Sequence, residues 1–311
     1  MQGVILAAGR GKRLRPLTLK RSKAMLPILG KPMVARVMEN IAEAGIREFI
    51  LVVSSKDEEL TSYFERCPEV RFAFQEEPLG TAHALNCAAH LIKGDFLLSA
   101  CDSLVPPNHI AEVIRTHRLN DADAVLSLQR VDRSELSRLS VVEMEENSVI
   151  RIVEKPSPAE APTNIASLPL YVLPPAILNY LDEVPLSPRG EYEIQDAIQM
   201  LIDQGKKIKG VFTEERLDLT KPEDLLSINL RYLAQGRDAE IASAALKADT
   251  KIIPPVRIEE GITIGEDCTI GPYVYLERGC ELGPRVRIRE AVVLRGTKVM
   301  EGTVKRKVLW A

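Results

Sequence analysis

A six-residue period near the C-terminus constrains the fold of this chain more than any other feature. An aliphatic side chain recurs at every sixth position, at Ile258, Ile264, Ile270, Leu276, Leu282, Ile288, Leu294 and Met300. A second apolar row runs two positions earlier, at Val256, Ile262, Cys268, Val274, Cys280, Val286 and Val292. A hexapeptide β-helix keeps such a period because each six-residue unit forms one face of a triangular prism. The period predicts a short parallel β-helix of fewer than about three coils, with both rows in its core.

The part of the chain before this repeat predicts an α/β domain. Strand-like segments at residues 2–8, 49–53, 70–74 and 95–99 alternate with helix-like segments at residues 33–44, 57–64 and 81–91. Strands and helices that alternate in this way form right-handed crossovers and a doubly wound, mostly parallel, Rossmann-like sheet. Such sheets bind ligands at the carboxyl ends of their strands, where this chain places the loop after Ala8 and the carboxylate of Asp102.

Residues 130–173 interrupt this alternation. The segments 141–144, 149–153 and 169–173 have strand patterns with no helix between them, which predicts an antiparallel lobe. A helix at 194–204, a strand at 208–212 and a helix at 222–232 follow. We therefore expect a large α/β domain over residues 1–235, a helical linker over 236–250 and the β-helix over 251–311.

Composition excludes several classes of protein. Apolar residues make up 45% of the chain and charged residues 27%, which is the balance of a globular protein. No apolar run reaches the roughly 18 residues of a transmembrane helix, and no basic segment precedes the apolar start, so we expect neither a membrane span nor a secretory signal. The five cysteines form no CxxC pair, which favours free thiols in a reducing cytoplasm.

Charge is distributed unevenly along the chain. Residues 1–38 contain nine Lys or Arg and no Asp or Glu, although the whole chain has a net charge of −3. A positive segment at the head of an acidic chain indicates a local anion site. No aromatic residue precedes Phe49, so this segment offers no platform for stacking nucleic-acid bases. We expect a bound polyphosphate and no nucleic acid.

The sequence LAAGRGKRLRPLTLKRSK, at residues 6–23, carries the predicted anion site. Gly9 and Gly11 allow the backbone to approach a ligand closely, and exposed N–H groups in such a loop bind anions. The surrounding cations are Arg10, Lys12, Arg13, Arg15 and Lys23. The loop is not a dinucleotide-binding fingerprint, because the third glycine of GxGxxG is missing, and it lacks the glycine spacing of a Walker loop.

Several motifs together resemble the sugar-1-phosphate nucleotidyltransferases, also called nucleotide-diphospho-sugar pyrophosphorylases. The resemblance begins with LAAGRGKRLRPLT and KAMLPILGKPM and continues in order with QEEPLGTAHAL, ACD, VVEMEENSVIRIVEKP, GEYEIQDAI and LDLTKPEDLL. It spans essentially the whole chain, since the family often carries a C-terminal left-handed hexapeptide β-helix. The resemblance implies a nucleotide-diphospho-sugar transferase fold and a catalytic domain over residues 1–235.

The resemblance also implies a role for particular residues of this chain. The nucleotide would be bound by Leu6, Ala8, Gly9, Arg10, Gly11, Lys12 and Arg13, and its base by Gln75, Gly80 and Thr81. Arg15, Lys23 and Asp102 would be catalytic, with Arg15 and Lys23 on the phosphates. Glu154, Lys155 and Ser167 would meet the sugar phosphate. Asp102 and Asp218 would hold Mg²⁺, a hard ion that prefers carboxylate and phosphate oxygens.

The activity implied is transfer of a nucleotidyl group from UTP or dTTP to a hexose 1-phosphate, glucose 1-phosphate first, with release of pyrophosphate. The alternatives are a guanylyltransferase acting on mannose 1-phosphate and a non-catalytic regulatory subunit of the same fold. Departures from the family pattern, among them Lys12, Ser140 and the SLPLY segment at 167–171, lie mostly on the sugar side and leave the sugar open.

The predicted β-helix is expected to have a structural role. Related β-helices transfer acyl groups with a histidine as base, but all four histidines here, at 83, 90, 109 and 117, precede the repeat. The ends of its coils also need covering. We therefore expect the β-helix to pack on the catalytic domain or on another subunit and to support a homo-oligomer.

Overall fold

The computed structural model describes residues 1–9, 11–119, 122–157, 159–236, 238–242 and 249–311. These residues fold into two units. The sheet unit comprises Met1–Arg10 and Val37–Arg216, and the coil unit comprises Gly11–Arg36 and Leu217–Ala311. The helix expected over the linker 236–250 falls partly outside the described residues, at 237 and 243–248.

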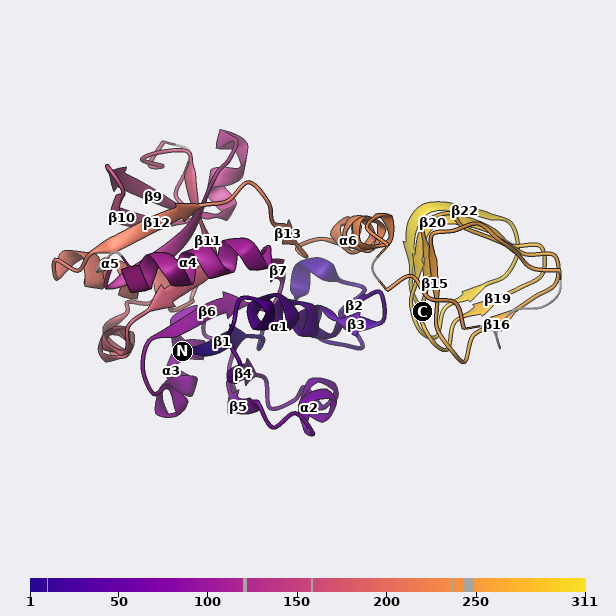
Figure 1. Ribbon diagram of the computed structural model, residues 1–311, viewed down its shortest axis with the longest axis horizontal. Helices are drawn as coiled ribbons and strands as arrows, with labels where there is room; N and C mark the ends of the chain where they lie inside the picture. The colour runs from indigo at the N-terminus through magenta and orange to yellow at the C-terminus, as the bar shows by residue number, and fades with distance from the viewer. Residues whose placement is uncertain (10, 120–121, 158, 237, 243–248) are drawn as a thin grey trace. The chain divides into compact units, whose positions relative to one another are not determined.

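A nine-stranded mixed sheet organises the sheet unit (Figure 1). Its order is β5 (Val70–Phe74), β4 (Phe49–Val53), β1 (Gln2–Leu6), β6 (Phe96–Ala100), β11 (Ile165–Leu173), β8 (Ala124–Arg130), β12 (Ile208–Phe212), β10 (Ser148–Glu154) and β9 (Ser140–Glu145). The pairs β5–β4, β4–β1, β1–β6 and β8–β12 are parallel. Strands β9, β10 and β11 pair antiparallel with their neighbours. The predicted doubly wound sheet with an antiparallel lobe is therefore confirmed.

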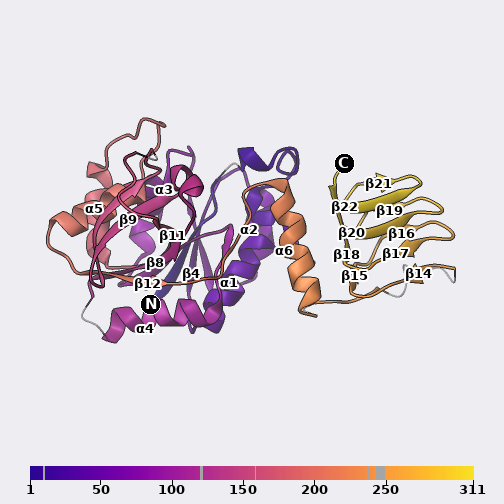
Figure 2. The ribbon, with the colours of Figure 1, turned by 90° about the horizontal axis from the view of Figure 1, so that it is seen from above.

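The two faces of this sheet are covered by different helices. Side chains alternate along a strand, so Val4 and Ile50 face one way and join a core with α3 (Thr81–Ala88) and α5 (Ile194–Asp203). The opposite face of β8 carries Ser127, whose hydroxyl is 2.7 Å from Nε2 of His109 on α4 (Pro107–Leu119). Figure 2 shows α4 across the sheet from α3 and α5. Both faces are buried, as a doubly wound sheet requires.

Shorter segments complete the sheet unit and its borders. They are α1 (Met33–Glu43), α2 (Glu58–Phe64), β7 (Ser103–Leu104) and the 3-10 turns η3 (Ala89–Leu91), η4 (Arg133–Arg138) and η5 (Pro175–Glu183). The helix predicted over 81–91 ends at Ala88 and continues as the turn η3. Within the described part of the chain, every helix falls short of the length and apolar character that crossing a membrane requires.

Parallel strands stacked in coils build most of the coil unit (Figure 2). The strands are β14 (Lys251–Ile252), β15 (Val256–Ile258), β16 (Thr263–Ile264), β17 (Thr269–Ile270), β18 (Val274–Leu276), β19 (Glu281–Leu282), β20 (Arg287–Val293), β21 (Lys298–Val299) and β22 (Thr303–Leu309). Two faces stack four strand levels and the third stacks three, so the expectation of fewer than three coils is wrong. The parallel β-helix itself is confirmed.

The six-residue rows lose their register in the later coils. Val256 pairs with Val274, Val274 pairs with Ala291, and Ala291 pairs with Lys307, so each step along the chain is one position shorter than the step before. Val293 and Val299 therefore join the β-helix core in place of Leu294 and Met300. Met300 is 74% exposed, so its predicted place in the core is wrong.

Another consequence of this register is a buried strip outside the prism. Val292 pairs with Tyr275 and with Val308, and side chains at these positions point away from the core that their strand neighbours fill. The predicted place of Val292 in the core is therefore wrong. All three are buried, and α6 (Pro222–Ala234) contacts β20 and β22. The helix therefore covers an apolar face that the β-helix leaves outside.

Cys268 and Cys280 lie inside the β-helix core, as predicted, and burial raises the pKa of Cys280 to about 12.

The N-terminal part of the coil unit forms a hairpin held by α6. Strands β2 (Pro27–Ile28) and β3 (Lys31–Pro32) are joined by Leu29 and Gly30. The Leu29 N–H donates to Oδ1 of Asn229 at 2.9 Å, and the Asn229 amide donates to the carbonyls of Pro27 at 3.2 Å and Leu225 at 2.8 Å. Asn229 is fully buried. Its amide thus satisfies polar groups that would otherwise be unpaired in the interior.

Replacing this amide tests how strongly it holds the coil unit together. We expect Asn229→Ala to lower the free energy of unfolding by about 2–4 kcal/mol, because buried groups lose their hydrogen-bond partners. Trp310, the single tryptophan, lies in the coil unit, so its fluorescence during urea titration reports on this unit. Asn86→Ala removes an exposed hydrogen bond to Asp182 and is the control. Equal urea midpoints for the two variants would contradict the assignment.

Candidate functional site

The basic loop predicted to bind phosphate belongs to the coil unit from Gly11 onward. Gly11 has φ 58°, and a Cβ there would lie 3.0 Å from Cβ of Lys23 and 3.1 Å from Cγ2 of Thr18. The Thr18 hydroxyl donates to the Gly11 carbonyl at 2.9 Å. Positive φ and close packing both favour glycine at this position. The loop is therefore folded tightly upon itself, with Lys23 beside Gly11.

Two leucines orient the cations of this loop. Leu14 and Leu17 are buried, while Lys12, Arg13 and Arg15 between and beside them are exposed. The short turns η1 (Lys12–Leu14) and η2 (Lys23–Met25) carry the first and last of the predicted cations that the structure describes. Arg10, also predicted to bind nucleotide, lies outside the described residues.

The carboxyl ends of β1 and β6 bring together further predicted residues in the sheet unit. The N–H of Cys101 donates to the carbonyl of Leu6 at 3.2 Å, which places Asp102 just beyond the end of β1. Ala8 and Gly9 continue from this end, and no atom lies within 4 Å of a Cβ built on Gly9. Strand ends of this kind are where ligands bind in doubly wound sheets.

Two sequence motifs, QEEPLGTAHAL and GEYEIQDAI, meet at the start of α3. A Cβ on Gly80 would lie 2.4 Å from the carbonyl oxygen of Tyr192, so this position tolerates only glycine. The Thr81 hydroxyl accepts the N–H of Ile194 at 2.9 Å. Gln75 is buried, and its side-chain amide donates to the carbonyl of Gly80 at 3.1 Å.

His83 completes this group. Its Nδ1 lies 2.9 Å from Nε2 of Gln75 and accepts from it, since the amide nitrogen only donates. The residues predicted to contact the base are thus fixed by hydrogen bonds to one another and to the 190–198 segment. Nothing in the sequence indicated that His83 holds Gln75.

The antiparallel lobe gathers the predicted sugar-phosphate residues. The hydroxyl of Ser140 on β9 donates to the carboxylate of Glu154 at the end of β10, and Nζ of Lys155 lies 2.6 Å from the same carboxylate. Ser167 on β11 pairs with Ser140 in register, and its hydroxyl lies 3.3 Å from that of Tyr171. Glu154, Lys155 and Ser167 therefore lie in one polar cluster.

Two acids in this cluster were not identified from the sequence. Glu193 is 3% exposed and forms an ion pair with Arg189 at 2.8 Å. Burial raises the pKa of the Glu193 carboxyl, and the nearby carboxylate of Glu154 raises it further. Burial and Glu154 also raise the pKa of Asp196. Both acids lie in GEYEIQDAI, which the sequence showed only as part of the family motif.

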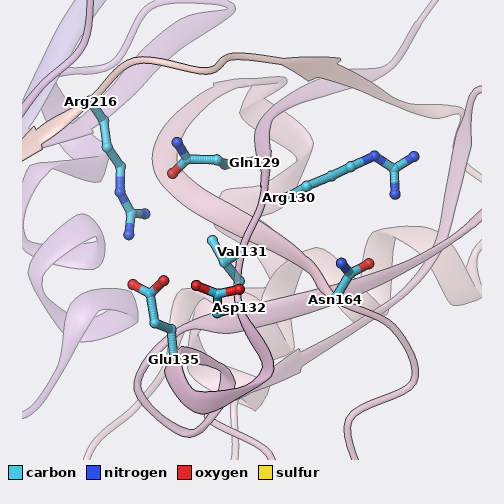
Figure 3. A pocket seen from close by; sticks show the side chains of 7 residues that line it. All are labelled: Gln129, Arg130, Val131, Asp132, Glu135, Asn164 and Arg216. Atoms are coloured by element: carbon cyan, nitrogen blue, oxygen red, sulfur yellow. The ribbon is translucent and has the colours of Figure 1, made fainter.

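A pocket of about 500 Å³ opens near the carboxyl end of β8 and the start of β11 (Figure 3). Figure 3 shows the carboxylates of Asp132 and Glu135 close together, with the side chain of Arg216 extending toward Glu135. The other lining residues are Gln129, Arg130, Val131 and Asn164. Sequence reasoning missed this pocket, although three of its charged residues lie at or within five residues of the end of the buried strand β8.

No group of three or more His, Cys, Asp or Glu side chains that could hold a metal ion occurs among the described residues. Asp102 follows β6, and Asp218 is the last residue of β13 (Leu217–Asp218). Each is half-buried. A carboxylate at either position provides oxygen donors of the kind that a hard divalent ion prefers.

Comparison with known proteins identifies similar sequences over both parts of the chain. Residues 2–235 match the family model described as nucleotidyl transferase, and residues 252–309 match the one described as GMPPB C-terminal domain. The UTP–glucose-1-phosphate uridylyltransferase AglF of Haloferax volcanii is 35% identical over 229 residues, which cover 72% of this chain and 93% of that protein.

A longer relative is the bifunctional protein GlmU of Methanococcus maripaludis. It is 35% identical over 269 residues, or 85% of this chain, and this chain spans only 62% of its length. A solved UDP-glucose pyrophosphorylase complexed with UDP-glucose superimposes with a TM-score of 0.68 at 24% identity, covering 75% of this chain and 98% of that chain. This likeness shows a shared fold.

The family match covers most of the chain, and it contains the basic loop, the strand-end aspartate and the polar lobe described above. The Haloferax volcanii relative matches over nearly its whole length. The chain therefore belongs to the nucleotidyl transferase family, among the sugar-1-phosphate nucleotidyltransferases.

Proposed function

We propose that this protein transfers a nucleotidyl group from an NTP to a hexose 1-phosphate and releases pyrophosphate. The observation that carries the proposal is the family match over residues 2–235, which include every residue expected to bind nucleotide, sugar phosphate or metal. UTP and glucose 1-phosphate form the proposed substrate pair, because the relative from Haloferax volcanii that carries those substrates in its name is matched over 93% of its length.

The basic loop supplies charge for this reaction. Attack of a sugar phosphate on the α-phosphate of an NTP brings two anions together, so the barrier is largely electrostatic. Cations held in place before the reaction lower it without a covalent intermediate. In our proposal Lys12 and Arg13 bind the nucleotide, and Arg15 and Lys23 stabilise the negative charge that builds up on its phosphates.

Asp102 and Asp218 are the proposed ligands of a magnesium ion. Their carboxylates are donors of the kind that Mg²⁺ prefers, and both chain segments belong to family motifs. When bound, Mg²⁺ would neutralise phosphate oxygens and polarise the reacting phosphorus. Asp102 follows the end of strand β6 and is half-buried there, which suits a residue that binds a metal ion at a strand end.

The polar lobe is the proposed sugar-phosphate site. Lys155 offers a cation for the phosphate, and Glu154 offers acceptor oxygens for sugar hydroxyls. The ion pair with Lys155 and the hydrogen bond from Ser140 orient Glu154 before substrate arrives. Such preorganisation reduces the entropy lost on binding.

A substrate panel tests the proposed function. Each of UTP, dTTP, GTP, CTP and ATP is incubated with glucose 1-phosphate, mannose 1-phosphate or another sugar phosphate, with Mg²⁺ or with EDTA, and pyrophosphate is measured. We expect release with UTP and glucose 1-phosphate, and none with EDTA. Release only from GTP and mannose 1-phosphate would replace the proposed substrates. No release from any pair, together with tight binding of a nucleotide sugar, would support a regulatory subunit instead.

Two substitutions test the proposed charges. We expect Lys23→Ala and Asp102→Asn each to lower kcat/KM by about 100-fold or more, because each removes charge stabilisation from the transition state. Lys20→Ala removes an exposed lysine of the same loop, and Asp95→Asn an exposed acid just before β6. Steady-state kinetics should show these two controls within about twofold of wild type. Losses of equal size in variants and controls would refute the assignment.

The buried acid beside the sugar-phosphate site predicts a pH dependence of stability. The pKa of Glu193 is raised from its ordinary value of 4.5, so above that pH the folded chain binds a proton more tightly than the unfolded chain. This contribution is greatest at low pH and is lost as pH rises through the raised pKa. We expect Glu193→Gln to flatten the fall in melting temperature as pH rises above 4.5. Parallel melting curves for variant and wild type would contradict this.

A further inference from the structure

A buried ion pair joins the basic loop to the β-helix inside the coil unit. Nη1 of Arg21 lies 2.8 Å from Oε1 of Glu277, and the two side chains are only 6% and 9% exposed. The other carboxylate oxygen of Glu277 accepts the N–H of Arg295 at 2.8 Å. Two segments from opposite ends of the sequence therefore share one fully engaged carboxylate.

A buried ion pair stabilises a loop only when its geometry is good. Taking two charges out of water is unfavourable, and their attraction offsets that only when the geometry is good. An apolar contact would hold the loop without that constraint on geometry. The pair thus fixes where Arg21 lies, because a displaced Arg21 would leave the buried carboxylate of Glu277 without its charged partner.

Arg21 lies close in sequence to the predicted phosphate-binding residue Lys23. It lies two positions before Lys23, which starts the turn η2 and packs beside Gly11. A short, tightly packed turn transmits a displacement at one end to its neighbours, since close-packed groups do not deform independently. The location of Arg21 therefore bears directly on the location of Lys23.

The β2–β3 hairpin, which follows the basic loop, also lies close to the β-helix. A Cβ built on Gly30, at the tip of the β2–β3 hairpin, would lie 3.0 Å from Nη2 of Arg257 and 3.1 Å from Oε1 of Glu259. That carboxylate accepts the hydroxyl of the fully buried Tyr275 at 2.6 Å. The hairpin tip therefore lies close to the β-helix, but it follows Lys23 by seven residues and is not part of the basic loop.

We propose that the Arg21–Glu277 ion pair is a positioning contact through which the β-helix sets the place of Lys23 for binding the NTP phosphates. The proposal rests on the proposed function, because it takes Lys23 as a phosphate-binding residue. It gives the β-helix a role in the reaction through the placement of Lys23. Arg21 and Glu277 act through Lys23 and are positioning residues.

The β-helix offers a matched control for Glu277. Glu259 occupies the equivalent position one coil earlier and is equally buried. Its carboxylate is bonded within the β-helix, to the Tyr275 hydroxyl and to both the N–H and the guanidinium of Arg278. Its ion pair is with Arg278, whereas that of Glu277 is with Arg21 in the loop. Glu259→Gln therefore perturbs the β-helix to a similar extent without breaking the link to Arg21.

The experiment compares Glu277→Gln, Arg21→Lys and Glu259→Gln with the wild-type chain. We expect Glu277→Gln to raise the KM for the NTP about tenfold while the KM for the sugar phosphate stays within about twofold. Arg21→Lys keeps the charge but loses the planar guanidinium, so its NTP KM should lie between those of Glu277→Gln and wild type. Amide hydrogen exchange should be faster over residues 12–25 in Glu277→Gln than in Glu259→Gln.

Three outcomes would overturn the proposal. The first is an NTP KM that rises equally in Glu277→Gln and Glu259→Gln, which indicates a general loss of stability. The second is an unchanged NTP KM in both Glu277→Gln and Arg21→Lys. The third is exchange over residues 12–25 that is no faster in Glu277→Gln than in Glu259→Gln. If the wild-type chain releases no pyrophosphate, the proposed function fails by itself, and exchange still decides whether the pair orders the loop.

Discussion

One fully buried amide connects two segments that stand far apart in the sequence. Asn229 on α6 accepts the N–H of Leu29 and donates to the carbonyl of Pro27, so hairpin and helix cannot separate without leaving buried polar groups unpaired. The rest of the coil unit follows from this constraint. The same helix covers the outward strip around Val292, and the Arg36 guanidinium donates to the carbonyl of Ile28 in the hairpin.

The β-helix could be predicted from the sequence because its core repeats one type of side chain at one interval. The register of the later coils could not be predicted from the sequence, because Val293 and Leu294 are both aliphatic and either could fill the core position. The backbone pairing of β18 with β20 is one residue shorter than the six-residue period predicts, and it places Val293 in the core. Met300 is exposed as a result. The alternating strands and helices of the sheet unit were predicted well, because buried strands and amphipathic helices have distinct local patterns.

The candidate site was predictable where its residues stand close together in the sequence. The basic loop is an example, since a cluster of cations beside two glycines is visible without a structure. Contacts between distant segments were not visible: Gly80 against the backbone of Tyr192, and Arg21 against Glu277. Glu193 appeared in the sequence only as part of the GEYEIQDAI motif, and its raised pKa comes from burial and from the nearby Glu154, which the fold creates.

The shortening of successive coils also limits how this domain could change its length in evolution. A duplicated copy of the segment 256–273 would keep the step from Val256 to Val274, and its side chains would face the same way as those of the coil that follows. The same copy added after β22 would meet the shorter step by which Ala291 pairs with Lys307. The two ends of the β-helix thus differ in the step length that an added coil would meet.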